Sequence, residues 1–334
     1  MRRWVMLFAV AVLGGASGAA AAPACGRACL AGVTDSYLKA LVARRPGELK
    51  TTPDVRFTED GAPLRLGDGL WRTIDALGSF RLDFVDPVQQ EAGAFVTVQE
   101  NGRPALMALR LKLRGGRISE VETILARKGE LQELQTALLD RPPAPFLEDV
   151  PPAERASRAE LTRIADSYFT AIEKADGSLV PFADDGFRIE NGVRTCNVKG
   201  PPNLGMPPEF ARLGAMKCAD QLSTRIFTYI ESIRPRRFAV VDVSRGLVLA
   251  IVRFNHPGDV PEVKTRGFGT LSMKNNPWAA RPTSALIAEL FKVRDHEIRQ
   301  VLAVITDTPY RMPTGWDGPG QAPPKVIPLE GRRK

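Results

Sequence analysis

The chain has 334 residues, of which 44% are hydrophobic and 25% are charged, and its formal net charge is +8. This length suggests about two domains, and the ordinary composition excludes a disordered or collagen-like chain. The basic residues are dispersed and do not form a cluster with interleaved aromatic residues. The sequence therefore predicts no nucleic-acid partner, and we interpret the charge as a solvated basic surface.

The first 22 residues have the layout of a secretory signal peptide. Arg2 and Arg3 precede an apolar stretch, and a small-residue segment ending in four alanines follows it. We expect cleavage after Ala21 or Ala22 and a periplasmic or secreted protein; the alternative is a lipoprotein with its lipid on Cys25. The apolar stretch is too short to span a bilayer and no other stretch is long enough, so no membrane segment is expected.

The cysteines favour disulfides. The chain has four of them: Cys25, Cys29, Cys196 and Cys218. An even number in an oxidising compartment indicates bridges, and chain order suggests Cys25–Cys29 and Cys196–Cys218. A bridge at the first spacing would be strained inside a helix, so we expect Cys25 just before one. Zinc is the alternative, but neither of the two histidines adjoins a cysteine, and we expect no metal and no cofactor.

Three sequence patterns occur twice, in the same order. Amphipathic helices are predicted over 34–44 and 165–175, and each is followed by a short strand that ends in an acid and a turn glycine, at 55–61 and 187–192. Farther on, residues 105–125 and 285–305 align without a gap, with seven of 21 positions identical. Alternation around Gly115-Gly116 predicts a hairpin, and the second copy has Asp295-His296, a poorer turn.

Proline-rich and loop-rich segments separate these copies. Residues 141–154 contain five prolines, which disfavour both helix and strand. We therefore divide the chain into a signal peptide (1–22), a first α+β domain (23–140), a linker (141–157), a second α+β domain with inserted loops (158–310) and an irregular tail (311–334).

The helix, short strand and antiparallel meander, read from DSYLKAL, RFTEDG, GDGLWRT and ISEVETI in the first half, resemble the nuclear-transport-factor-2-like superfamily, which includes SnoaL-like and ketosteroid isomerase-like proteins. DSYFTAI, RIENG and IRQVLAVI carry the resemblance in the second half. More narrowly, the chain is similar to exported bacterial proteins with two such units. The resemblance implies two cone-shaped α+β units, each a curved antiparallel sheet wrapped around N-terminal helices. It also implies a mostly apolar cavity for a small hydrophobic ligand.

Glu289 is the first candidate catalytic residue. It falls in phase with Ala285, Ile287 and Phe291 on a predicted strand, where the first copy has Leu109. A carboxylate in an apolar strand face is costly unless it is paired or functional, so Glu289 is either an acid or base in a cavity or a residue on an exposed face.

His256 and Asp242 are further catalytic candidates. His256 lies in phase with apolar residues at the end of a predicted strand, and histidine is a proton shuttle near neutral pH. Asp242 lies on the preceding strand and could pair with it across the hairpin. The alternative for His256, just before Pro257, is an ordinary loop residue.

The remaining candidates are two helix tyrosines, a carboxylate at a strand end and an aromatic–arginine pair. Tyr37 and Tyr168 occupy one repeat position on the first helix, where a tyrosine in ketosteroid isomerase-like proteins donates a hydrogen bond to a ligand; the alternative is a core tyrosine. Glu190 could be a pocket carboxylate or part of an acidic turn. Trp71 and Arg72 could roof a pocket or form a helix–sheet contact.

The sequence contains no nucleophile elbow, phosphate loop, dinucleotide fingerprint or zinc-protease helix. The hypothesis is therefore a cofactor-independent lyase or isomerase that acts on a small hydrophobic molecule in the second domain. The alternative is a non-catalytic module that binds a ligand or a protein and is built as an intramolecular pseudo-dimer. The sequence does not indicate the oligomeric state.

Overall fold

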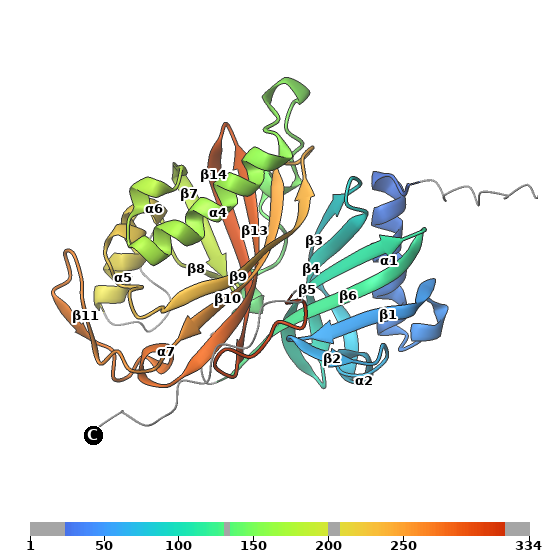
Figure 1. Cartoon of the computed structure of the whole chain (residues 1–334), viewed down its shortest axis with the longest axis horizontal. Helices are drawn as coiled ribbons and strands as arrows, with labels where there is room; N and C mark the ends of the chain where they lie inside the picture. The colour runs from blue at the N-terminus through green and yellow to red at the C-terminus, as the bar shows by residue number, and fades with distance from the viewer. Residues whose placement is uncertain (1–23, 130–133, 200–207, 318–334) are drawn as a thin grey trace, which may run out of the picture.

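The computed structural model describes residues 24–129, 134–199 and 208–317. The predicted signal peptide and residues 318–334 of the predicted tail lie outside these ranges. Two α+β units lie side by side, with the N-terminal unit in blue to green and the C-terminal unit in green to red (Figure 1). No helix among the described residues combines the length and the apolar character that a membrane crossing needs.

The first unit is a six-stranded sheet curved around one long helix. Its sheet order is β2-β1-β6-β5-β4-β3. The elements are α1 (Arg27–Val42), β1 (Thr51–Glu59), β2 (Ala62–Leu64), α2 (Leu70–Thr73), β3 (Ile74–Asp86), β4 (Glu91–Glu100), β5 (Arg103–Arg114) and β6 (Arg117–Arg127).

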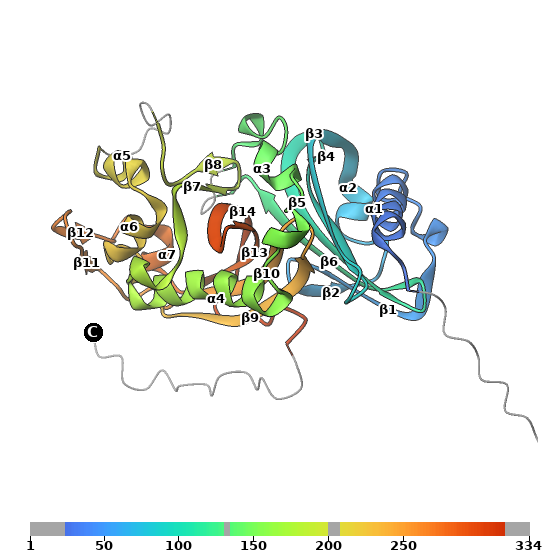
Figure 2. The same ribbon diagram turned by 90° about the horizontal axis from the view of Figure 1, so that it is seen from above.

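The second unit repeats this order as β8-β7-β14-β13-β10-β9. Its elements are α4 (Arg158–Lys174), β7 (Phe182–Glu190), β8 (Val193–Arg194), β9 (Ser232–Asp242), β10 (Leu247–His256), β13 (Thr283–Arg294) and β14 (Glu297–Thr308). Inserted segments add α5 (Pro208–Ala215), α6 (Cys218–Ser223), β11 (Glu262–Lys264), β12 (Thr270–Ser272) and α7 (Pro277–Ala280). They gather at one end of the curved sheet (Figure 2).

The two cone-shaped α+β units agree with the predicted fold class, with one refinement. Each meander is antiparallel, but β1 joins β6 in parallel and β7 joins β14 in parallel, so both sheets are mixed. A hydrophobic pattern shows that a segment is a strand, but it does not show which neighbour the strand joins or in which direction.

The predicted hairpins are present at both repeat positions. Gly115 and Gly116 have φ of +58° and +72°, and Asp295 and His296 have φ of +53° and +62° in the second copy. Both turns therefore have the left-handed central pair of a type I′ hairpin, although the second lacks glycine. Both disulfides also form, Cys25–Cys29 and Cys196–Cys218, and Cys25 precedes α1 as expected.

The outer faces of the two sheets pack against each other. One apolar cluster joins side chains such as Phe84 and Leu106 of the first unit to Leu249 and Leu290 of the second. β13 is consequently buried along both faces, with its even-numbered residues toward the first unit and its odd-numbered residues inside its own cone. This packing leaves the interior of each cone as a separate space.

Charged contacts across this interface are reciprocal. Asp86 ends β3, accepts a hydrogen bond from the Val241 N–H at 3.0 Å and pairs with Arg158. Asp242 ends β9, accepts from the Val85 N–H at 3.3 Å and pairs with Arg27. The two aspartates hold equivalent places at the ends of equivalent strands, as do the two arginines at the starts of α1 and α4. The interface therefore has the self-complementary arrangement of a twofold dimer within one chain.

Candidate active site

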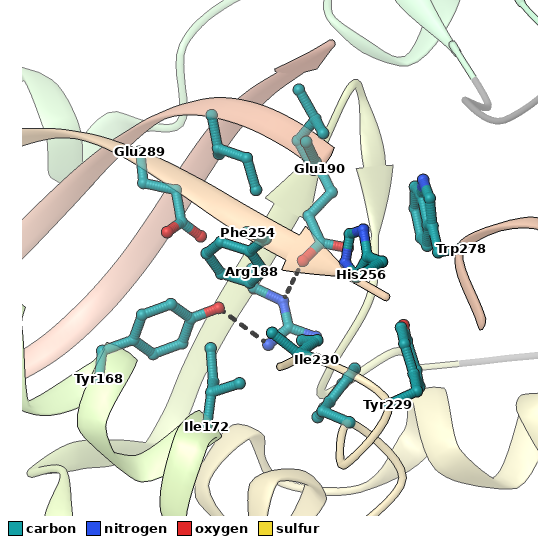
Figure 3. A pocket seen from close by; sticks show the side chains of 14 residues that line it. Tyr168, Ile172, Arg188, Glu190, Tyr229, Ile230, Phe254, His256, Trp278 and Glu289 are labelled. Atoms are coloured by element: carbon teal, nitrogen blue, oxygen red, sulfur yellow. Dashed lines mark hydrogen bonds and ion pairs between the residues drawn. The ribbon is translucent and has the colours of Figure 1, made fainter. Parts of the chain in front are cut away.

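The interior of the second cone contains a cavity of about 70 Å³. It lies between α4, the concave face of the sheet and the inserted segments (Figure 3). Its walls are largely aromatic and aliphatic, and its polar groups are few. The polar and aromatic residues that line it are Tyr168, Arg188, Glu190, Phe227, Tyr229, Phe254, His256, Trp278 and Glu289.

Arg188 is the charged centre of this cavity. It lies on β7, is 3% exposed, and its Nε is 2.8 Å from Glu190 Oε1 and 2.9 Å from Thr195 Oγ1. Its Nη1 donates to the Tyr168 hydroxyl at 3.2 Å and its Nη2 to the Gln221 side-chain oxygen at 2.5 Å. These partners hold the guanidinium in one orientation, as a buried charge requires.

Glu289 projects from β13 into the same space and is 2% exposed. Its Oε2 has no hydrogen-bond partner among the described residues. Burial, and secondarily the nearby Glu190 carboxylate, raises the pKa of Glu289 to about 8, although Arg188 and the Tyr168 hydroxyl act in the opposite direction. Near neutral pH the group is therefore mainly a neutral acid that can give a proton, with a minor ionised fraction that can accept one.

Tyr168 presents its hydroxyl between Arg188 and Glu289 (Figure 3). Its ring makes edge contacts with Phe169 of α4, Phe182 of β7 and Phe291 of β13, at centroid distances of 5.3, 6.2 and 5.4 Å. Burial raises the pKa of this phenol well above its ordinary value, so it stays protonated. Because the phenol oxygen accepts from a guanidinium, its own O–H becomes a stronger donor.

His256 lies toward the inserted segments, where its ring stacks on Trp278 at 5.8 Å and contacts Tyr229 at 5.8 Å. It is 2% exposed, and Nδ1 has no hydrogen-bond partner among the described residues. Burial lowers the pKa of His256 to about 4, so the imidazole is neutral at pH 7. The inserted segments form their own small apolar cluster around Tyr229 and Met273, which closes this end of the cone.

Four predicted site residues thus meet in one cavity: Tyr168, Glu190, His256 and Glu289. Asp242 does not join them, and the predicted pairing of Asp242 with His256 is wrong. Asp242 lies opposite Leu247 at the far end of the β9–β10 pair, on the interface between the units, whereas His256 is the last residue of β10. The turn brings the two strands together, but the ten-residue length of β10 separates these side chains.

The first-unit candidates do not line the Glu289 cavity. Tyr37 and Trp71 are fully packed, with their ring centroids 5.3 Å apart in an edge-to-face contact. The Arg72 side chain is 75% exposed and 3.6 Å from Asp68, and it lines a surface hollow of the first unit together with Trp71. For Tyr37 the structure matches the alternative of a core tyrosine.

Sequence reasoning missed Arg188, Tyr229 and Trp278. A signal for Arg188 was present in the alignment of the two short strands. Arg188 holds the position that Phe57 holds in the first unit, on the face of the strand that points inward. Tyr229 and Trp278 lie in irregular inserted segments with no periodic pattern, and nothing in the sequence shows that these segments return to the cone.

Comparisons with known proteins concern mainly the second unit and the fold. A family model described as a domain of unknown function (DUF8021) matches residues 154–305. No curated protein matches the chain.

Several solved structures align with part of the chain. One is a protein with a ketosteroid isomerase-like fold from Catenulispora acidiphila, in complex with trimethylamine (13% identity, 46% of this chain and 97% of that one, TM-score 0.24). Another is the hexachlorocyclohexane dehydrochlorinase LinA-type3 from Novosphingobium barchaimii (15% identity, 46% and 88%, TM-score 0.25). Because these TM-scores are low, the assignment of the fold rests on the strand order of the chain itself.

Proposed function

We propose that the protein is an exported, cofactor-independent lyase or isomerase that moves a proton on a small hydrophobic molecule held in the second-unit cavity. The observation that carries this proposal is the buried Glu289 carboxyl, whose Oε2 lacks a partner among the described residues and lies beside the Arg188–Tyr168 pair. A buried carboxyl with a raised pKa in a cavity is the usual form of a catalytic acid or base.

The proposed step begins with ionised Glu289. Its carboxylate takes a proton from a carbon next to a substrate carbonyl, and the C–H electron pair moves onto the carbonyl oxygen. The Glu289 acid then returns the proton to a different carbon, which completes an isomerisation. In a lyase the electron pair instead expels a leaving group from the neighbouring carbon. A pKa near 8 suits this role, because the base is strong and still partly ionised near neutral pH.

Tyr168 would stabilise the oxygen that becomes negative. Its hydroxyl is a neutral donor in a dry site and is strengthened by Arg188 at 3.2 Å. Neutral His256 would orient the ligand at the other end of the cavity, since its Nδ1 is available as an acceptor or donor according to its tautomer. Glu190 balances the Arg188 charge at 2.8 Å.

The size of the cavity favours the alternative, a binding module without chemistry. A cavity of about 70 Å³ is smaller than the roughly 300–1,000 Å³ of common ligand pockets. A substrate must then be very small, or the inserted segments must move apart to admit it. The two functions differ in whether Glu289 exchanges protons with the bound molecule.

Deuterium exchange separates these two functions and does not require the natural substrate. Small cyclic and linear ketones are incubated with the mature protein in D₂O, and deuterium uptake at carbon is followed by mass spectrometry. We expect Glu289→Gln to lower the exchange rate by about 100-fold or more, and Tyr168→Phe by a smaller factor. Tyr37→Phe, the equivalent change in the packed first unit, is the matched control. Ketones that bind but exchange no faster than with Glu289→Gln would establish the binding module.

The titration of Glu289 has a consequence that needs no substrate. The unfolded chain releases this proton near the ordinary glutamate pKa, whereas the folded chain holds it to about 8. Folding therefore takes up a proton in this window, and stability falls with rising pH by about 1.4 kcal/mol per unit, then levels off above pH 8. We expect Glu289→Gln to remove this slope in chemical unfolding at pH 5 to 9. An identical slope in the variant would show that Glu289 is ionised throughout.

A further inference from the structure

A second hollow lies between the two units, on the opposite face of the sheets from the cone interiors. It has a volume of about 480 Å³ and is lined by β4, β5 and β6 of the first unit, by α4 and β9 of the second, and by Trp316. The Trp316 indole closes one side, with the Arg56 and Arg110 guanidinium carbons 4.3 and 4.8 Å from its ring centre. This hollow is separate from the Glu289 cavity.

A buried ionic cluster forms the base of the hollow. Arg110 is 2% exposed and donates to Glu122 at 2.8 Å, to Glu120 at 2.8 Å and to Glu91 at 3.3 Å. Glu122 also accepts from Arg237 across the interface at 2.6 Å. Each of the three guanidinium nitrogens of Arg110 thus has a carboxylate partner, so Arg110 serves to hold the carboxylates.

Three other cations reach the hollow with donors to spare. Lys112, Arg158 and Arg237 have side chains 36%, 31% and 27% exposed. Lys112 has one carboxylate partner in the described residues, Glu91, at 3.1 Å, and the Nε–H and Nη1–H groups of Arg237 have no partner in that part of the chain. These side chains can therefore donate to an anion placed between them.

Glu91 supplies one acceptor that the protein leaves unused. It is 5% exposed, and both Arg110 and Lys112 contact its Oε1. Its Oε2 is buried at the hollow without a hydrogen-bond partner among the described residues. An unsatisfied carboxylate oxygen costs free energy, so a donor supplied by a bound molecule would be stabilised there.

The equivalent place on the other side of the interface shows that these ions are not needed for packing. Strand register makes Leu247, Leu290 and Leu302 the counterparts of Glu91, Arg110 and Glu122. These leucines are fully buried in the apolar cluster, where Phe146 and neighbouring residues of the connecting segment cover them. Leucines stabilise this contact without desolvating charges, so the polar side carries a cost that a ligand site would explain.

We propose that the hollow between the units binds a small carboxylate with a hydrogen-bond donor on the adjacent carbon, such as an α-hydroxy or α-amino acid. The carboxylate lies among Lys112, Arg158 and Arg237, and the hydroxyl or ammonium donates to Glu91 Oε2. The N-terminus of the 17-residue helix α4, which begins at Arg158, adds favourable partial charge for the anion.

Calorimetric titration of the full mature chain with lactate, alanine and propionate tests this proposal. We expect lactate or alanine to bind about tenfold or more tightly than propionate, which has the carboxylate but lacks the donor. Glu91→Gln should remove this preference, and Lys112→Gln should weaken all ligands together. Arg72→Gln, which removes an exposed cation outside the hollow, is the control and should change nothing.

Several results would overturn the proposal. These are the absence of saturable binding of all three acids, equal binding of propionate and lactate, or an unchanged preference in Glu91→Gln. Because Glu91 belongs to a buried cluster, circular dichroism should first confirm that its variant is folded. Lys112 is partly exposed and its variant provides an independent test. Stronger binding of lactate or of alanine identifies a hydroxyl or an ammonium as the preferred donor.

Discussion

The two cones share a framework and differ in what fills them. Both have a tyrosine on the long helix at the same position, and both have the same strand order. Two polar groups of the second interior, Arg188 and Glu289, have apolar counterparts in the first, whereas the tyrosine is kept. The equivalent pairs are Tyr37 and Tyr168, Phe57 and Arg188, and Leu109 and Glu289.

These exchanges explain why one interior is packed and the other is open. Phe57 and Leu109 join Trp71 and Tyr37 in a continuous apolar core. In the second unit a guanidinium and a carboxyl need polar partners, which keep the neighbouring side chains apart and leave a cavity. The first unit has the features of a packed support for the second. Comparing the two interiors tests how much the buried polar groups lower the free energy of unfolding.

Exchanging the residues at the paired position on β5 and β13 should have the largest effect. We expect Leu109→Glu to lower the free energy of unfolding by about 3–5 kcal/mol, because the packed cone has no arginine to receive a carboxyl. Glu289→Leu should raise it by about 1–2 kcal/mol, because it removes a desolvated acid. Urea unfolding at pH 7 followed by circular dichroism measures both changes. Changes of the same sign and size would contradict the difference between the interiors.

The reciprocal aspartates should respond alike. Asp86→Asn and Asp242→Asn each remove a charge that pairs with an arginine of the other unit, and we expect each to cost about 1–3 kcal/mol. Double variants with Arg158→Gln and Arg27→Gln should show coupling within each pair. If Asp242→Asn alone abolished turnover with stability unchanged, Asp242 would be part of the site after all.

The smallest effect is expected at the paired turns Asp60 and Asn191. Asn191 accepts from the Ile305 N–H at 2.8 Å and donates to the Ile305 carbonyl at 3.0 Å, which fixes a wall of the cavity. Asp60 accepts from the Leu125 N–H at 2.7 Å and pairs with Arg127. We expect Asn191→Asp to cost about 1 kcal/mol, since it loses one donor, and Asp60→Asn to cost a similar amount through Arg127. Thermal unfolding measures both, with Asn101→Asp at an exposed turn as the control.

Much of the framework could be predicted from the sequence. The repeated helix, the short strand and the hairpin each have a local pattern, and each is present where the pattern places it. Glu289 could be recognised because a charge interrupts an alternating apolar strand. The fault in the prediction was Asp242, which has the same alternation but lies on the outer side of its sheet, at the second unit's contact with the first. Alternation of apolar and polar residues distinguishes the two faces of a strand, but it does not show which of the two faces lines a cavity.

The two-unit organisation, the elements of each unit and the cysteine pairs could be predicted, because these depend on residues close together in the chain or on the repeat. The sequence does not show that Tyr168, Arg188, His256 and Glu289 line one cavity, or that Glu91 faces a second hollow between the units. Those groups come from separate strands and helices. Their proximity follows from sheet curvature and from packing between the units, and neither property belongs to any single segment.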